Sequence, residues 1–151
     1  MKRGFTLVEI MIVVAIIALL AAIAIPNLLR ARLQANESAA QAALKTIATG
    51  EITYRSGNNN YTNLNGLGSA VPPYIDGQLG CGTEPCTKNG YNFTCDATES
   101  EEKFVAVAVP LNDNVTGVRK FCITEDGVVR VNSSIDDATD HDGCQAFGPS
   151  P

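Results

Sequence analysis

The sequence predicts an α+β chain in which one long N-terminal α-helix packs on a small antiparallel β-sheet. The run from Ile10 to Ile25 contains no polar residue, and apolar residues then continue at helical spacing to about residue 54. Short β-type segments with short polar connections fill residues 91–132, which is typical of an antiparallel meander. The chain has 151 residues, 45% hydrophobic and 18% charged, which is enough for one domain with a modest core.

A single helix is expected from about Thr6 to about Tyr54, with an apolar first half and an amphipathic second half. Along it, apolar side chains recur at spacings of three, four or seven residues and form one stripe, which comprises Leu29, Leu33, Ala40, Leu44 and Ile47. Pro26 has no N–H to donate, so it should bend or loosen the helix just before it, and two helices broken at Pro26 are the alternative. Turn-forming residues at 56–60 should end the helix.

The polar region that follows is expected to hold four strands. They are Tyr91–Cys95, Phe104–Val109, Arg119–Thr124 and Val128–Asn132, with residues 125–127 as a hairpin turn between the last two. Residues 60–79 are punctuated by Gly and Pro and should form a loop. Because the helix stripe and the sheet each need to bury one face, the sheet should cover the amphipathic half of the helix.

Two ordinary interpretations of the N-terminus leave Glu9 without a role. A secretory signal peptide would use Lys2 and Arg3 as its basic region and Ala22–Ile23–Ala24 as its cleavage site, but Glu9 would interrupt its apolar region. A plain anchor would need more than the run after Glu9, which is short of the ~20 residues that cross a bilayer. Extending the span to include Glu9 costs at least ~2.5 kcal/mol for the carboxylate. An interpretation that uses the glutamate is therefore preferred.

The segment Lys2–Arg3–Gly4–Phe5–Thr6–Leu7–Val8–Glu9–Ile10 resembles the class III leader of type IV pilins and of type II secretion pseudopilins. The match comprises a short basic leader, Gly4 before the cut, Phe5 as the first mature residue and Glu9 as the fifth. The resemblance implies that a membrane-bound prepilin peptidase and N-methyltransferase cleaves after Gly4 on the cytoplasmic side and methylates the new amine of Phe5. Pro26 falls at the kink position found in many of these proteins.

The same resemblance gives Glu9 a task in assembly. It implies that the Glu9 carboxylate pairs with the Phe5 amine of a neighbouring subunit when apolar helices bundle into a filament. An unpaired carboxylate among packed apolar helices is strongly penalised, so such a pair would reject arrangements with the wrong axial offset. Phe5, Glu9 and Pro26 are therefore the expected assembly residues.

The resemblance divides the chain into three parts. Residues 1–4 are the leader removed by prepilin peptidase, residues 5–26 are the transmembrane and filament-core half of the helix, and residues 27–151 are the periplasmic or extracellular pilin globular domain. The globular domain should contain the amphipathic helix to about residue 55, a loop, the four-stranded sheet and an acidic tail. Further stretches that look like a pilin group with one long helix and a small sheet are 30–37, 47–54, 90–93, 117–121 and 127–130.

The function that the resemblance implies is that of a structural, non-enzymatic subunit of a type IV pilus. The chain would sit in the inner membrane as a single-pass protein and then enter an extracellular helical homopolymer. Its partners would be other copies of itself, the membrane, the prepilin peptidase, the pilus assembly platform and minor pilins. A pseudopilin of a type II protein secretion system is the alternative within the family, and a plain secreted binding domain is the alternative outside it.

All five cysteines follow residue 80, in the part that an N-terminal apolar segment would export, which favours disulfides in an oxidising compartment. No C-x-x-C pair occurs and there is one histidine, so a zinc site is disfavoured. Strand alternation puts Cys95 and Cys122 on opposite faces of the sheet, which disfavours a bond between them. The preferred bond is Cys122–Cys144, which would tie down the C-terminal tail as in many pilins. Cys81–Cys86 would close a small loop and leave Cys95 free and buried.

Composition argues against several other classes of function. The net charge of −5 and the pI of about 4.7 disfavour nucleic-acid binding. A single histidine without an evident nucleophile, and the lack of a Gly-rich phosphate loop after a strand, give no catalytic residues and no cofactor site. An acidic tail is formed by Asp136, Asp137, Asp140 and Asp142 with His141. A solvated loop is preferred to a calcium site there, because the spacing matches no EF-hand loop.

Overall fold

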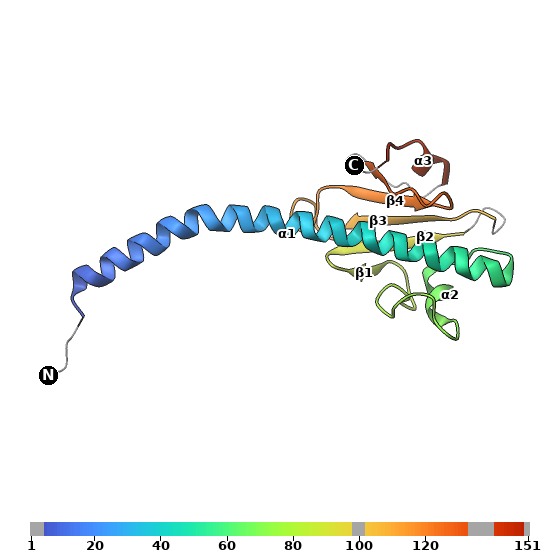
Figure 1. Cartoon of the computed structure of the whole chain (residues 1–151), viewed down its shortest axis with the longest axis horizontal. Helices are drawn as coiled ribbons and strands as arrows, with labels where there is room; N and C mark the ends of the chain where they lie inside the picture. Colours follow the sequence, from blue (N-terminus) through green and yellow to red (C-terminus); the bar gives the residue numbers. More distant parts are fainter. Residues whose placement is uncertain (1–4, 98–101, 133–140, 150–151) are drawn as a thin grey trace. The chain divides into compact units, whose positions relative to one another are not determined.

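The computed structural model describes residues 5–97, 102–132 and 141–149 (Figure 1). The chain divides into two compact units, Met1–Arg32 and Leu33–Pro151. Helix α1 begins in the first unit and ends in the second, whereas the whole sheet belongs to the second. The two units are therefore described separately.

Helix α1 runs from Leu7 to Asn58 and continues through Pro26. The expectation of one long helix is confirmed, and the alternative of two helices broken at Pro26 is wrong. A proline removes one main-chain hydrogen bond, and strong helix formers on both sides compensate for that loss. Beside Pro26, the side-chain amide of Asn27 donates to the Ile23 carbonyl oxygen at 3.1 Å.

The helix ends later than the expected Tyr54 because its last turn is stabilised by side chains. Ser56 Oγ donates to the Thr53 carbonyl oxygen at 2.7 Å, and Asn58 Nδ2 donates to the Tyr54 carbonyl oxygen at 3.1 Å. These bonds occupy carbonyl groups in the last turns of the helix. Asn59 then takes a left-handed conformation with φ of 62°, which ends the helix.

The second unit contains a five-stranded antiparallel meander with strand order β1-β2-β3-β4-β5. The strands are β1 Cys86–Lys88, β2 Tyr91–Asp96, β3 Val105–Pro110, β4 Lys120–Thr124 and β5 Arg130–Asn132. The predicted meander is confirmed, but the predicted count of four strands is wrong because β1 was not recognised. Asn89 and Gly90, with φ of 50° and 76°, form the two-residue turn that pairs β1 with β2.

The sheet packs on the second half of α1 and encloses the main core (Figure 1). From the predicted helix stripe, Ala40, Leu44 and Ile47 are fully buried, whereas Leu29, in the first unit, is 57% exposed. The sheet contributes side chains that alternate along the strands, namely Tyr91, Phe93, Cys95, Ala106, Ala108, Phe121 and Ile123. The expected covering of the amphipathic half by the sheet is thus confirmed.

Two short helices were not predicted. Helix α2, Leu64–Ser69, lies within the expected loop, and Asn63 caps it by accepting a hydrogen bond from the Gly66 N–H at 2.9 Å. Helix α3, His141–Gln145, packs beside β4 on the face opposite the main core (Figure 1). There Cys122 and Cys144 form a second buried cluster with Val105 and Val107. Both helices are too short for helical periodicity to reveal them.

Candidate functional site

The first unit presents an apolar surface without any cover from the chain. From Leu7 to Leu29 its large apolar side chains are 50–75% exposed. Leaving one such side chain in water instead of burying it costs roughly 1.5–3 kcal/mol, so the helix needs lipid or apolar protein around it. Among the described residues, α1 is the one helix long and apolar enough to cross a membrane.

Thr6 and Glu9 form a capping box at the start of α1. The Thr6 N–H donates to Glu9 Oε2 at 2.9 Å, and the Thr6 hydroxyl donates to the same oxygen at 2.7 Å. In return the Glu9 N–H donates to Thr6 Oγ1 at 3.3 Å. This local role of Glu9 was not predicted, although Thr-x-x-Glu at a helix start is the recognised sequence signal of a capping box.

The residues expected to act in processing and assembly fall in the first unit. Gly4 lies outside the described residues. Phe5 directly precedes the capping box and is 85% exposed, and Pro26 lies inside α1. The Oε1 atom of Glu9 accepts no hydrogen bond from any residue that the structure describes. One carboxylate oxygen at the helix start is therefore open to a further donor.

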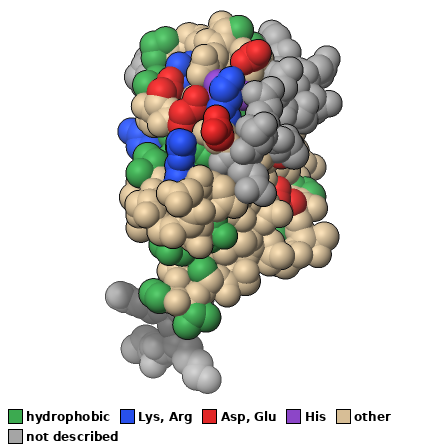
Figure 2. Space-filling view, turned by 90° about the vertical axis from the view of Figure 1, so that its right-hand side faces the viewer, with side chains coloured by type: hydrophobic (Ala, Val, Ile, Leu, Met, Phe, Trp, Pro, Cys, Tyr) green, Lys and Arg blue, Asp and Glu red, His purple; other side chains and the backbone are tan. Residues whose placement is uncertain are grey.

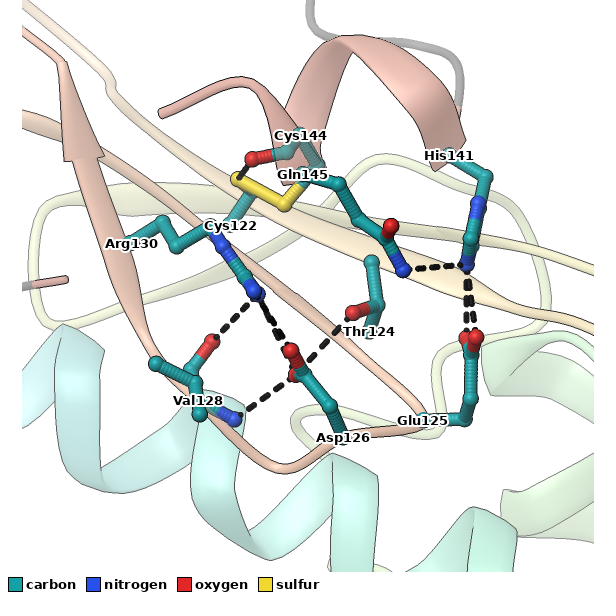
Figure 3. The surroundings of a disulfide bond; sticks show 9 residues. All are labelled: Cys122, Thr124, Glu125, Asp126, Val128, Arg130, His141, Cys144 and Gln145. Carbon is teal, nitrogen blue, oxygen red and sulfur yellow. Dashed lines mark hydrogen bonds and ion pairs between the residues drawn. A yellow bond between two sulfur atoms is a disulfide. The ribbon is translucent and has the colours of Figure 1, made fainter. Parts of the chain in front are cut away.

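Two disulfides lie in the second unit, in the pairs that the sequence analysis preferred. Cys81 and Cys86 have Cα atoms 5.6 Å apart, and Cys122 and Cys144 have Cα atoms 6.0 Å apart. The second bond joins β4 to α3 (Figure 3). Cys95 is a buried free thiol on the core face of β2. Burial is the main cause that raises the pKa of this thiol well above its ordinary value.

Polar contacts also hold α3 against the β4–β5 turn (Figure 3). His141 is 6% exposed, and its Nε2 lies 2.8 Å from both carboxylate oxygens of Glu125. Although burial lowers the pKa of His141, the bonds to Glu125 and Asp142 outweigh it and raise the pKa above its ordinary value. On this side of the unit acidic and basic side chains intermingle around the histidine (Figure 2).

Asp126 organises the β4–β5 turn itself (Figure 3). Its carboxylate accepts hydrogen bonds from the Thr124 hydroxyl, the Val128 N–H and the Arg130 guanidinium. The bond to Arg130 is the main cause that lowers the pKa of Asp126 to about 2. The turn extends past Val128, so β5 begins at Arg130 instead of the expected Val128.

The expected acidic tail is described only in part. Asp136, Asp137 and Asp140 lie outside the described residues, whereas Asp142 lies in the first turn of α3 with its side chain 85% exposed. Within the described ranges 5–97, 102–132 and 141–149, no three His, Cys, Asp or Glu side chains are grouped so as to hold a metal ion.

Two carboxylates that sequence reasoning missed lie at the main core. Glu51 is fully buried in α1 and accepts hydrogen bonds from the Thr62 N–H at 3.0 Å and the Cys95 thiol at 3.6 Å. Glu84 accepts from the N–H groups of Leu64 and Cys95, both at 3.0 Å. Burial is the main cause that raises the pKa of Glu51 to about 7, and the Glu84 charge adds to it.

Glu37 is a second buried carboxylate, and it fixes α1 to the segment before β4. Glu37 Oε1 accepts from the Val118 and Arg119 N–H groups at 3.1 and 3.2 Å. The Arg119 guanidinium donates to Oε2 from Nε at 2.8 Å and lies 2.7 Å away at Nη2. Although burial opposes it, the hydrogen bonds from the Arg119 side chain and from the two backbone N–H groups hold the pKa of Glu37 below its ordinary value.

A shallow groove of about 510 Å³ lies along the second half of α1. Its lining consists of Lys45, Thr46, Thr49, Gly50, Thr53, Pro73 and Tyr74. The threonine hydroxyls donate to carbonyl oxygens of their own helix, at 2.7–3.0 Å. No carboxylate, imidazole or thiol lines this groove, so it lacks the acid–base pair or nucleophile of a hydrolytic site.

Comparison with known proteins places the clearest similarity at the N-terminus. Residues 1–25 match the model of the prokaryotic N-terminal methylation motif. The chain is 35% identical over 139 residues to the type IV major pilin protein PilA of Myxococcus xanthus. This alignment covers 91% of this chain and 56% of that protein. The chain is also 50% identical over 60 residues to the type IV wide pilus major component PilA4 of Thermus thermophilus. This alignment covers 40% of this chain and 46% of that protein.

Proteins of type II secretion systems form a second class of relatives, and their alignments with this chain are shorter. The type II secretion system core protein G of Escherichia coli is 37% identical over 71 residues, covering 46% of this chain and 49% of that protein. The chain spans about half the length of these curated relatives. No solved structure gives a significant match. The predicted resemblance to type IV pilins and to the related type II secretion pseudopilins is confirmed.

Proposed function

We propose that this chain is a structural subunit of a type IV pilus. The single observation that carries the proposal is the uncovered apolar helix of the first unit, which coincides with the methylation motif at residues 1–25. The folded second unit, called the head below, is joined to this helix. Lipid can surround the helix before assembly, and other copies of the chain can surround it in the filament. Similarity to the major pilin of Myxococcus xanthus extends over 91% of the chain, well past the helix, and supports a pilin role for the head as well.

Processing and location follow from the motif in this proposal. A prepilin peptidase and N-methyltransferase cleaves after Gly4 and methylates Phe5, while the helix of residues 5–26 stays in the inner membrane. The assembly platform and minor pilins then transfer the mature chain into an extracellular homopolymer. The role is mechanical and involves no catalysis, cofactor or nucleic acid. The disulfides Cys81–Cys86 and Cys122–Cys144 form after export and stabilise the head.

Glu9 sets the register of the bundled helices in the same proposal. Its Oε2 atom already caps the helix through Thr6, and the open Oε1 atom is the acceptor for the Phe5 amine of a neighbouring copy. The capping bonds hold the carboxylate at the helix start, where it is available for pairing. Pro26 adjusts the path of the helix within the bundle.

The direct test is the chemistry of filaments sheared from the host cell surface. We expect their main protein to be this chain, with a mature N-terminus at N-methylated Phe5 by mass spectrometry. A mature N-terminus at Ile25 would indicate a signal peptide and contradict the proposal. Filaments that lack the chain would exclude the role of major subunit.

A pseudopilin of a type II secretion system is the second candidate, favoured by the 37% identity to core protein G. That match covers 71 residues, whereas the match to the major pilin covers 139 residues, so the pilin role is preferred. Deletion of the gene separates the two. Loss of surface filaments with normal protein export supports the pilin role, and blocked export with intact filaments supports the pseudopilin.

A further inference from the structure

The β3–β4 loop, residues 111–119, exposes three apolar side chains in the second unit. Leu111 is 49% exposed, Val115 is 70% exposed and Val118 is 46% exposed. Single exposed apolar side chains are common, but three within residues 111–118 concentrate apolar surface on this one loop. This set of Leu111, Val115 and Val118 is called the loop patch below.

Hydrogen bonds on the inner side of the loop keep the loop patch facing outward. The Leu111 N–H donates to the Gly90 carbonyl oxygen at 2.9 Å, and Asn36 Nδ2 donates to the Thr116 carbonyl oxygen at 2.8 Å. Glu37 accepts the N–H groups of the last two residues of the loop. A loop fixed to a sheet turn at one end and to α1 at the other cannot turn its apolar side chains into the core.

Close packing under the loop leaves little freedom for rearrangement. Gly117 lies against Tyr91, and a Cβ atom at position 117 would come within 2.0 Å of the Tyr91 hydroxyl oxygen. The same hydroxyl donates to the Arg119 carbonyl oxygen at 2.8 Å. The loop is therefore a preformed surface, and its binding would cost little conformational entropy.

One carboxylate accompanies the loop patch. Asp113 is exposed and lies between Leu111 and Val115 in the sequence. Its side chain makes no hydrogen bond or ion pair with a residue that the structure describes. The loop thus combines apolar surface with a carboxylate that has no ion-pair partner among the described residues.

The complementary combination occurs at the end of the first unit. Leu28 and Leu29 are 69% and 57% exposed, and Arg30 and Arg32 follow them directly. Neither arginine pairs with an acidic group in the described part of the chain. After cleavage following Gly4, the first unit keeps Arg30 and Arg32 and one carboxylate, Glu9. The remainder of the chain holds 7 Lys and Arg and 15 Asp and Glu, so it is acidic.

We propose that the loop patch of one copy binds the Leu28–Arg32 segment of a second copy, with Asp113 facing Arg30 or Arg32. The leucines would cover the valines of the loop patch, and the arginine would lie beside Asp113 at the rim. The contact is heterologous, because one surface of each copy meets a different surface of the next, so it can continue along an open filament. This inference rests on the proposed function as a filament subunit.

The first test is charge reversal in cells that make filaments. Asp113→Arg alone, and Arg30→Asp with Arg32→Asp, should each lower the yield of sheared filaments about tenfold, because like charges then meet at the contact. All three changes together should restore the yield. Wild-type yields from both reversals, or a combination no better than either alone, would overturn the inference.

The second test detects the contact directly by cross-linking. Filaments of a Leu29→Cys and Val115→Cys double variant should give a ladder of covalent multimers on a non-reducing denaturing gel. Filaments of a Leu29→Cys and Val71→Cys variant are the matched control, because Val71 is also apolar and 98% exposed but lies outside the loop. Equal ladders, or none from the first variant, would overturn the inference.

The experiments distinguish failure of the proposed pilus role from failure of the proposed contact between copies. Filaments that contain the chain, with normal yields from the reversed charges and no ladder, leave the pilus role standing and remove the contact. Wild-type filaments that lack the chain remove the pilus role, and the contact with it.

Discussion

The first and second units of this chain differ in whether the chain itself buries their large apolar side chains. In Met1–Arg32 the large apolar side chains remain mostly exposed, whereas in Leu33–Pro151 the largest ones, such as Phe93, Phe104 and Phe121, are almost fully buried. The second unit therefore obtains its stability from its own fold. The first unit is a helix stabilised by its own local hydrogen bonds, and its apolar side chains need lipid or other copies to cover them.

The contrast predicts that equal substitutions in the two units give different defects. Phe121→Ala in the core of the second unit should lower the free energy of unfolding by about 3–5 kcal/mol, because it leaves a cavity. Leu19→Ala in the first unit should leave that free energy nearly unchanged and reduce filament yield. Denaturant unfolding of the detergent-solubilised chain, followed by tyrosine fluorescence, measures the first effect. Equal losses of stability would remove the distinction between the units.

The disulfide to α3 should have the next largest effect. Cys122→Ala with Cys144→Ala should lower the free energy of unfolding by about 3 kcal/mol, because the bond closes a loop with a sequence separation of 22 residues. The same unfolding experiment measures it. A stability that does not change on reduction of the wild-type chain would show that the bond does not form in the native protein.

Glu51 should make the second unit less stable as the pH rises. The folded pKa is raised from 4.5 to about 7, so the stabilisation is complete below pH 4.5 and is lost as the pH rises to about 7. Glu51→Gln should abolish that dependence and add about 2–3 kcal/mol at pH 8, since one pKa unit corresponds to about 1.4 kcal/mol. A Glu51→Gln variant whose stability falls between pH 4.5 and 6.5 as steeply as that of the wild type would contradict this assignment.

His141 should give a smaller effect of the same sign. Its pKa is raised by Glu125 and Asp142, so its contribution is present at acid pH and is lost as the pH rises through the raised pKa. His141→Asn should lower stability at pH 5 by about 1 kcal/mol or less and change little at pH 9. The matched control is Asp142→Asn, because the Asp142 side chain is 85% exposed and should matter less. A larger effect at pH 9 than at pH 5 would contradict the ion pair.

Much of the fold could be predicted because it follows from periodicity. The stripe of Ala40, Leu44 and Ile47 and the alternation of Tyr91, Phe93 and Cys95 mark the buried faces of α1 and β2. Strand β1 was missed because a three-residue strand is too short to alternate visibly. The turn that creates it, Asn89–Gly90, was a readable signal.

The buried carboxylates could not be predicted for a different reason. A helical pattern assigns charged residues to the exposed face, but Glu37 and Glu51 are buried because backbone N–H groups from distant segments donate to them. Those partners lie 81 and 11 residues away in the sequence, so only the folded structure brings them together. The proposed processing and assembly residues of the first unit, Phe5 and Glu9, were named from the N-terminal motif, which depends on no such contact.

The central claim is that other copies cover the first unit in the assembled filament. The most direct measurement is thiol labelling of a Leu19→Cys variant by a water-soluble maleimide in sheared filaments, which contain no bilayer. We expect no labelling until the filaments are dissociated in denaturing detergent, whereas a Val71→Cys control labels at once because that side chain is 98% exposed. Labelling of position 19 at the same rate as position 71 in intact filaments would contradict the account.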